Sequence, residues 1–229
     1  MDQIPHHIGI ILDGNRRWAR ARNKPTFFGH KRGFDNLKKI ATHAFDRGVK
    51  ILTVYAFSTE NWKRSKEEVG YLMELFKLMV TQELDYLHKK GIKLNILGDT
   101  SAFDNELQDG IKKALAKTKN NRKGTLNVCL NYSGRQEILL AVKNIIKDKI
   151  SPDKIDQELF AKYLYTKDMP DPDMIIRTSG EHRLSGFLTW QSVYSEFYFP
   201  KKDWPAFTPK DLDKAIEEFN NRNRRFGGN

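Results

Sequence analysis

Residues 6–18, His-His-Ile-Gly-Ile-Ile-Leu-Asp-Gly-Asn-Arg-Arg-Trp, are the stretch of the chain that decides its fold. The run 8–12 is short, apolar and rich in β-branched residues, which is typical of a buried strand. The run ends at the carboxylate of Asp13, which a glycine, an asparagine and two arginines follow. In α/β proteins, ligands bind where strands end and helices begin. The stretch therefore predicts a strand of a parallel sheet with a ligand site at its carboxyl end.

The residues after this strand suit a metal-bound diphosphate. A carboxylate such as Asp13 can hold a hydrated Mg²⁺ when a diphosphate supplies other oxygens. Gly14 and Asn15 permit a tight turn that directs backbone N–H groups toward an anion. Arg16 and Arg17 add fixed positive charge. The same residues also fit an ordinary Asp-Gly turn with an aspartate helix cap, so both interpretations stay open at this point.

The composition indicates a globular protein with an anionic partner. The 229 residues, 39% of them hydrophobic and 30% charged, suffice for one domain with a sizeable core. The apolar runs are too short to cross a bilayer, and we expect no secretory signal. The single cysteine, Cys129, excludes an intrachain disulfide and favours the core of a cytoplasmic protein. The net charge of +11 fits nucleic acid, an anionic membrane surface or phosphorylated small molecules.

No linker, repeat or low-complexity segment divides the chain, so we expect a single domain over residues 1–229. Strand-like runs alternate with amphipathic helical patterns, which predicts an α/β fold with a mostly parallel sheet flanked by helices. The expected strands are residues 8–12, 51–57, 92–97, 126–131, 174–177 and 194–199. The expected helices are residues 31–46, 67–89, 105–119, 135–147, 157–165 and 209–223.

Polar and charged side chains follow the strand-like runs and should share one edge of the sheet. Residues 57–64 combine hydroxyls, an acid, an amide and two cations, as polar surface loops commonly do. Trp62 within them favours a loop that covers an apolar ligand. After the fifth strand, Arg177 and Arg183 flank a Thr-Ser-Gly turn with donors suited to a diphosphate. Glu196 lies in an otherwise apolar strand, where a carboxylate needs a metal or an arginine as partner.

Two further features leave alternatives open. The helical stripe that contains Leu72, Leu75 and Phe76 fits core packing and also fits the wall of an apolar tunnel. His182 on its own is more typical of a surface or capping residue than of a ligand.

The motifs of the chain resemble those of the cis-prenyltransferase (isoprenyl transferase) family, most closely its bacterial undecaprenyl diphosphate synthases. The similarity extends from residue 7 to residue 228 and includes several separate blocks in the family's order. These blocks are His-x-Gly-Ile-Ile-Leu-Asp-Gly-Asn-Arg-Arg-Trp18, Gly29-His-Lys31, Tyr55-Ala-Phe-Ser-Thr-Glu-Asn-Trp62, Asn131-Tyr-Ser-Gly-Arg135, Ile176-Arg-Thr-Ser-Gly-Glu-His-Arg183 and Arg224-Arg-Phe-Gly-Gly228.

The resemblance implies a single catalytic domain with an apolar tunnel and a Mg²⁺-dependent reaction. Isopentenyl diphosphate would add repeatedly to an allylic diphosphate, typically farnesyl diphosphate, to give a medium- or long-chain Z-polyprenyl diphosphate. Asp13 would position Mg²⁺, with His182 and Glu196 completing its environment, and Asn61 would assist proton removal. The other implied substrate-binding residues are Gly14, Asn15, Arg16, Arg17, Trp18, Thr26, His30, Ser58, Thr59, Glu60, Trp62, Arg64, Arg177, Arg183, Leu184 and Ser185.

One residue departs from the family pattern. Thr26 occupies the position where the family usually carries an arginine, three residues before the Gly-His pair. The allylic diphosphate would thus lose a charged partner, for which Lys24 is an imperfect substitute because it lacks the arginine fork.

The resemblance also implies a homodimer, and the basic surface and greasy product suggest transient contact with an anionic membrane. Two other functions stay open: a non-catalytic subunit of a two-chain prenyltransferase, and a nucleic-acid-binding protein. Against the first, the chain retains the strand-end aspartate and the Arg/His segment. Against the second, Asp13, Glu60 and Glu196 would repel phosphates unless a metal intervened, so we expect no nucleic-acid partner.

Overall fold

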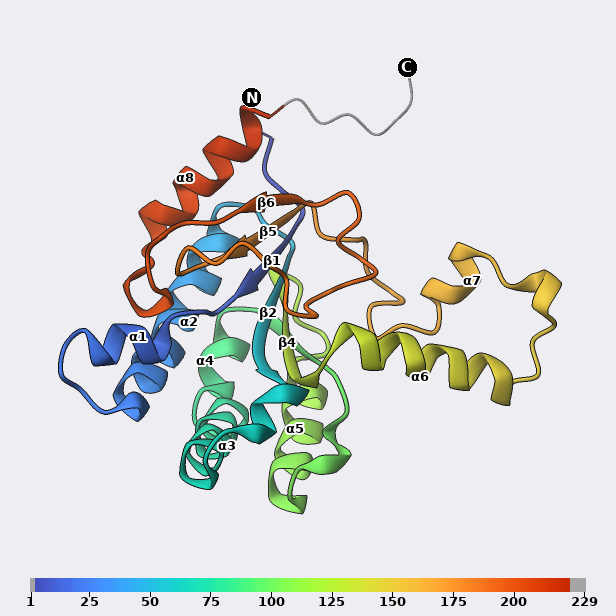
Figure 1. Ribbon diagram of the computed structural model, residues 1–229, viewed down its shortest axis with the longest axis horizontal. Helices are drawn as coiled ribbons and strands as arrows, with labels where there is room; N and C mark the ends of the chain where they lie inside the picture. Colours follow the sequence, from blue (N-terminus) through green and yellow to red (C-terminus); the bar gives the residue numbers. More distant parts are fainter. Residues whose placement is uncertain (1–2, 223–229) are drawn as a thin grey trace.

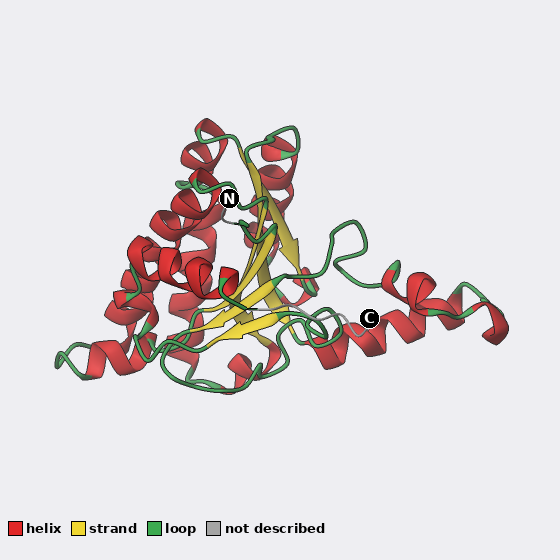
Figure 2. Cartoon of the chain, turned by 90° about the horizontal axis from the view of Figure 1, so that it is seen from above, coloured by secondary structure: helices red, strands yellow, loops and turns green. Residues whose placement is uncertain are grey.

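The computed structural model describes residues 3–222 and contains a central parallel sheet in this part of the chain. The sheet has six strands in the order β3-β4-β2-β1-β5-β6, and every neighbouring pair is parallel. Most helices pack on one side of the sheet, whereas α6 and α7 extend away from the other side (Figures 1 and 2). The expected α/β architecture with a parallel sheet is confirmed.

The strands agree closely with the sequence prediction, apart from a shorter last strand. Their bounds are β1 His7–Ile11, β2 Ile51–Ser58, β3 Ile92–Leu97, β4 Gly124–Tyr132, β5 Met174–Arg177 and β6 Glu196–Tyr198. The α-helices are α1 Asn15–Arg20, α2 Thr26–Asp46, α3 Lys66–Val80, α4 Leu84–Lys89, α5 Asn105–Thr118, α6 Gly134–Lys147, α7 Gln157–Ala161 and α8 Pro209–Asn220. Short 3₁₀ turns are η1 Thr59–Lys63, η2 Thr100–Ala102, η3 Pro152–Lys154 and η4 Trp204–Ala206.

The expected single helix over residues 67–89 is wrong, because the chain forms two helices there. The Thr81 hydroxyl donates to the Lys77 carbonyl at 2.7 Å, a local bond that competes with the helical backbone and bends helices. The Glu83 amide then donates to the Leu78 carbonyl at 3.1 Å, five residues back rather than four. The regular helical ladder is interrupted between α3 and α4, although the apolar stripe continues through both.

Helix α2 begins five residues earlier than predicted, and the short helix α1 precedes it. Glycines at positions 29 and 33 lower the helical propensity of this segment. Both are needed for a close approach: a Cβ on Gly29 would lie 2.0 Å from the Asn15 carbonyl oxygen, and one on Gly33 would lie 2.2 Å from Asn15 Oδ1. These glycines thus form a groove in α2 that receives the first residue of α1. The groove fixes the loop that carries Asp13.

The core occupies both faces of the sheet. All residues of β1 are buried, as expected for a central parallel strand covered on both sides. Ile8 and Ile10 belong to the larger cluster, which includes residues of α2, α3, α5 and α8, while Ile11 packs with Phe187 and Leu188 in a smaller one. Cys129 is a buried free thiol, as expected. No helix among residues 3–222 combines the length and apolar character that a membrane span requires.

Candidate active site

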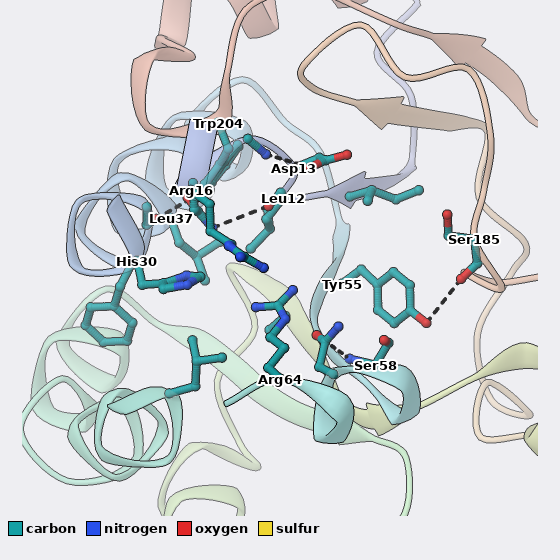
Figure 3. A pocket seen from close by; sticks show the side chains of 18 of the residues that line it. Leu12, Asp13, Arg16, His30, Leu37, Tyr55, Ser58, Arg64, Ser185 and Trp204 are labelled. Atoms are coloured by element: carbon teal, nitrogen blue, oxygen red, sulfur yellow. Dashed lines mark hydrogen bonds between the residues drawn. The ribbon is translucent and has the colours of Figure 1, made fainter. Parts of the chain in front are cut away.

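A cavity of about 830 Å³ opens at the carboxyl ends of the central strands. Charged residues from the β1–α1 loop, α1, α2, η1 and β5 surround its mouth, and Figure 3 shows Asp13, Arg16, His30 and Arg64 among them. The deeper wall is apolar and comes mainly from α2 and α3. It includes Phe34, Leu37, Leu72, Leu75, Phe76 and Met79. The cavity therefore has a polar end suited to an anion and an apolar end suited to hydrocarbon.

Asp13 lies at the polar end between two arginines. Its Oδ2 accepts from Arg177 Nη2 at 2.9 Å, and its Oδ1 pairs with Arg17 Nη2 at 3.0 Å. The Gly14 amide also donates to Oδ1, at 2.7 Å. About a quarter of the Asp13 side chain stays exposed, at 27%. One carboxylate is thereby held rigidly at the mouth with an accessible edge.

Arg177 is buried at the end of β5 and connects Asp13 to the following loop. Its Nη1 donates to Ser185 Oγ at 2.8 Å and also to the Arg183 carbonyl. The Tyr55 hydroxyl donates to the Ser185 carbonyl at 3.4 Å (Figure 3). Burial raises the pKa of Tyr55, so this hydroxyl stays protonated at neutral pH. The loop after β5 is thus fixed beside the polar end of the cavity.

A second carboxylate, Glu68 near the start of α3, gathers the basic residues on the opposite side of the mouth. Glu68 Oε1 accepts from His30 Nε2 and from Arg64 Nη1, each at 3.0 Å. Its Oε2 lies 3.8 Å from Arg16 Nη1. The Glu68 carboxylate therefore contacts three predicted substrate-binding residues, which come from three different parts of the chain.

The charges in this cluster shift one another's protonation. Burial alone would raise the pKa of Glu68, but the His30 hydrogen bond and the charges of Arg64 and Arg16 lower it overall. Burial lowers the pKa of His30, and the nearby Arg64 and Arg16 add to that effect. Burial likewise lowers the pKa of Arg64, with Arg16 contributing. Glu68 alone does not balance the positive charge of Arg16 and Arg64, so an anionic substrate would neutralise what remains.

Asp203 and Trp204, which are far from Asp13 in the sequence, lie against the loop that carries Asp13. Gly14 has φ of +101°, and a Cβ there would lie 2.4 Å from Asp203 Oδ1, so only glycine fits. The Trp204 amide donates to the Asp13 carbonyl at 2.9 Å, and its indole Nε1 donates to the Gly33 carbonyl at 2.8 Å. Trp204 is fully buried and joins the loop to α2.

The η1 turn after β2 is closed by its own side chains. Ser58 and Asn61 form a reciprocal capping arrangement, in which the Asn61 Oδ1 accepts from the Ser58 amide at 3.1 Å. Trp62 is exposed and donates from Nε1 to Asn131 Oδ1 at 2.8 Å. Its ring meets the edge of Phe57, with the ring centroids 5.1 Å apart. Trp62 therefore packs beside the cavity rather than lining it.

The structure brings most predicted site residues to one cavity and leaves others around it. Those that line the cavity are Asp13, Gly14, Asn15, Arg16, Arg17, His30, Ser58, Glu60, Asn61, Arg64, Arg177 and Ser185. Those outside the lining are Trp18, Thr26, Thr59, Trp62, His182, Arg183, Leu184 and Glu196.

Asp13, His182 and Glu196, which the resemblance implied as a metal environment, do not come together as a cluster within residues 3–222. Glu196 begins β6 and pairs with Met174, three residues before the strand end that carries Arg177. Its carboxylate accepts from Arg222 at 2.9 Å, which supplies the arginine partner that the sequence allowed. His182 is exposed and stacks on Phe199. Only Asp13 of the three lines the cavity.

Sequence reasoning missed Glu68, Trp204 and Arg20 as site residues. Glu68 had a local signal, because Ser65-x-x-Glu68 is a helix-start pattern, and Ser65 Oγ accepts from the Glu68 amide at 3.2 Å. No local sequence signal marked Trp204, because its contact with the Asp13 loop joins positions that are far apart in the chain. Arg20 lines the cavity from the last turn of α1, a helix for which no residue range was predicted.

Comparison with known proteins gives a consistent result. Residues 11–227 match the family model described as putative undecaprenyl diphosphate synthase. An isoprenyl transferase of Clostridium perfringens is 49% identical over 99% of this chain and 91% of its own length. One from Streptococcus thermophilus is 48% identical over 100% of this chain and 95% of its own length.

Two solved structures share the fold. Lavandulyl diphosphate synthase from Lavandula x intermedia, in complex with dimethylallyl diphosphate, superposes with a TM-score of 0.94 at 35% identity, covering 98% of this chain and 99% of that one. A probable undecaprenyl diphosphate synthase from Campylobacter jejuni gives a TM-score of 0.83 at 30% identity, with both chains covered in full. The predicted motif at residues 224–228 lies outside the described residues.

Proposed function

This chain belongs to the undecaprenyl diphosphate synthase family of cis-prenyltransferases, and from that premise we propose that it elongates an allylic diphosphate with isopentenyl diphosphate. The observation that carries the proposal is the divided cavity, whose mouth holds Asp13 between two arginines and whose depth is apolar. A prenyl diphosphate has the same division, with charge at one end and hydrocarbon along the rest. Farnesyl diphosphate is the proposed starter.

In the proposed reaction the bond between the allylic carbon and its diphosphate oxygen breaks, and the diphosphate leaves with the electron pair. The terminal alkene carbon of isopentenyl diphosphate forms the new bond to that allylic carbon. The positive charge then lies on C3 of the added unit, and loss of a proton from C2 to a diphosphate oxygen creates the new double bond. Arg16, Arg17 and the backbone N–H groups at the start of α1 stabilise negative charge that develops on the leaving group.

Arg177 and Ser185 are the proposed partners of the second substrate, isopentenyl diphosphate. They lie beside Asp13 on the β5 side of the mouth, opposite the Glu68 cluster. Asn61 lines the same cavity, but its Oδ1 already accepts a backbone hydrogen bond. We therefore propose that Asn61 assists proton removal by orienting a substrate group, since a carboxamide is a poor base.

The donor set at the mouth fits Mg²⁺ held jointly by Asp13 and the substrate. Mg²⁺ binds through one or two carboxylates together with phosphate oxygens and water, so a single accessible carboxylate suffices. Magnesium bound there would neutralise charge on the departing diphosphate. Asp13 would hold it, and the arginine partners of Asp13 would orient the carboxylate.

The apolar part of the cavity would enclose the growing chain. A small apolar cavity of about 20 Å³ lies further along and shares Phe34, Leu37 and Met79 with the main one. Its lining also includes Lys38 and Glu83, which form an ion pair at 2.8 Å. The two cavities are therefore separated by the side chains of Phe34, Leu37 and Met79. We propose that these side chains limit the product to a medium-length chain.

We further propose a homodimer, in keeping with the family. Helix α6 projects from the body (Figure 1) and carries exposed apolar side chains, among them Leu139 and Ile146 at 59% and 70% exposure. Such a face is suited to burial against a second copy.

A turnover assay tests the proposal. Purified protein with Mg²⁺, farnesyl diphosphate and labelled isopentenyl diphosphate should give a butanol-extractable product, and Asp13→Asn should reduce turnover by roughly two to three orders of magnitude. Asp99→Asn is the matched control, because Asp99 also follows a strand but does not line the cavity. An inactive wild-type protein, or equal activity of Asp13→Asn, would refute the proposal.

A further inference from the structure

The segment from Gly14 to Phe34 concentrates much of the positive charge of the molecule. Residues 14–34 contain seven arginines and lysines and no aspartate or glutamate. The segment forms α1, a turn and the start of α2, and it projects from the body as a corner in Figure 1. Arg16 and Arg17 belong to the cavity. Arg22, Lys24, Lys31 and Arg32 are exposed on the corner itself.

The same corner exposes large aromatic side chains. Phe27 and Phe28 are 51% and 44% exposed, although both begin a helix whose other face is buried in the core. Trp18 stacks on Phe28, with the ring centroids 6.1 Å apart. Arg22 lies 4.4 Å above the Trp18 ring, and Lys24 lies 5.8 Å from the Phe28 centroid. We call this set of residues, Trp18, Arg22, Lys24, Phe27, Phe28 and Arg32, the aromatic corner.

Within residues 3–222, the cations of the aromatic corner have no carboxylate that neutralises them. Among the described residues, no carboxylate forms an ion pair with Arg22, Lys24 or Arg32, whereas Lys31 is paired with Asp35. Arg32 follows Phe28 by four residues, so both side chains lie on one face of α2. Aromatic rings with free cations beside them match the interfacial region of a bilayer, where the rings enter the headgroup layer and the cations meet anionic lipid.

The aromatic corner adjoins the cavity. Phe27 contacts Tyr71 of α3, with the ring centroids 5.6 Å apart, and so joins the N-terminal halves of the two helices whose inner faces form the apolar wall. Arg20, which lies between Trp18 and Arg22 of the corner in the sequence, lines the cavity. A surface that binds the corner would therefore lie beside the mouth of the cavity.

We propose that the aromatic corner docks this protein on an anionic lipid surface. The choice of a lipid partner rests in part on the proposed function, because a polyprenyl product has to leave an apolar cavity for another apolar phase. Nucleic acid would also meet the positive charge. A duplex gives no reason, however, for two adjacent phenylalanines to remain exposed on a helix of a folded domain, and a single strand, whose bases stack on such rings, has no use for the apolar cavity beside them. The lipid surface accounts for both the charge and the rings.

Vesicle sedimentation tests the proposal. The wild-type protein should pellet with vesicles of phosphatidylcholine containing about one third phosphatidylglycerol, and much less with phosphatidylcholine alone. The variant R22Q/R32Q should partition roughly tenfold more weakly, because each basic side chain near an anionic surface contributes several-fold. F27S/F28S should weaken partitioning by a similar factor, because it removes the exposed rings that enter the headgroup layer. Lys24 is left unaltered, since it lies beside a candidate substrate contact. The matched controls are I155S/V193S, which removes exposed apolar groups elsewhere, and K112Q/K119Q on and beside α5.

Activity and nucleic-acid measurements separate the possible outcomes. In buffer without lipid, all variants should retain wild-type turnover with farnesyl diphosphate, so loss of docking is distinguished from failure of the proposed function. Vesicle binding that is unchanged in both corner variants would overturn the proposal. The proposal would also be overturned if the protein ignored vesicles but bound a short RNA or DNA, single-stranded or duplex, tightly at physiological salt, and if the same variants abolished that binding.

Discussion

At the scale of single residues, two carboxylates organise the mouth of the cavity. Asp13 holds Arg17 and Arg177, and Glu68 holds the group of His30, Arg64 and Arg16. The second group keeps its cations aligned before substrate arrives, which lowers the cost of binding a diphosphate. Glu68 is therefore a positioning residue in this account.

We predict that Glu68→Gln weakens binding of the allylic substrate more than it slows turnover. The amide keeps the size of the side chain but removes the charge that aligns His30 and Arg64. KM for farnesyl diphosphate should rise about tenfold, with kcat changed much less. The control is Glu67→Gln, whose side chain is exposed on the same turn of α3. Equal kinetic constants for Glu68→Gln and Glu67→Gln would contradict the assignment.

Thr26 begins α2 and does not line the cavity. Thr26 precedes the cavity-lining His30 by four residues, so an arginine here would lie on the same face of α2 and would add a planar donor pair for a phosphate. We predict that Thr26→Arg lowers KM for the allylic diphosphate, whereas Thr26→Val does not. Steady-state kinetics with geranyl and farnesyl diphosphates measure the effect. Unchanged KM values for both starters would defeat the prediction.

At the scale of elements, α2 and α3 together form the apolar wall of the cavity. Leu37 of α2 and Met79 of α3 are buried and line both the main cavity and the small one beyond it. A smaller side chain at either position should join the two spaces. Such a cavity costs stability but lengthens the space for hydrocarbon.

We predict that Met79→Ala shifts the product toward longer chains. Each additional isoprene unit would then find apolar surface where Met79 now blocks it. Chromatography of the dephosphorylated products measures the length distribution. Leu78→Ala is the control, because Leu78 packs against the same core without lining either cavity. An unchanged distribution in Met79→Ala would argue against this limit on product length.

Local patterns in the sequence predicted the elements whose cause is local. The strand ending at Asp13 was evident because an apolar run stops at a charged residue. The break after Val80 was not evident, since it depends on a Thr81 side-chain bond while the apolar stripe continues unbroken. The positions of Asp13 and Arg177 side by side followed from the parallel sheet. The parallel sheet did not predict that Glu196 lies apart from Asp13 and Arg177, because the position of Glu196 depends on where β6 begins.

At the scale of the whole molecule, a buried histidine links the sheet to the loop before β5. His7 is 1% exposed; its Nδ1 donates to the Pro170 carbonyl at 2.8 Å, and its Nε2 accepts from Thr53 Oγ1 at 2.7 Å. Burial lowers the pKa of His7 to about 4, although the Pro170 hydrogen bond and Asp173 oppose the change. The native protein thus holds His7 neutral.

We predict that acid destabilises the protein through His7. Between about pH 6.5 and 4 the unfolded chain binds a proton at this residue that the folded chain does not, so the free energy of unfolding falls as pH falls through that window. A pKa difference of between two and three units corresponds to about 3 kcal/mol in total. Urea titrations at several pH values measure the slope. His7→Gln should flatten it, and an identical slope in that variant would contradict the prediction.

The most direct test of the central claim is a structure of this protein crystallised with Mg²⁺ and a non-reactive thio analogue of farnesyl diphosphate. We expect the diphosphate to lie against the start of α1, with a magnesium ion on Asp13 and the hydrocarbon along the wall formed by Leu72, Leu75 and Phe76. A diphosphate bound away from Asp13, or a hydrocarbon chain outside that wall, would contradict it.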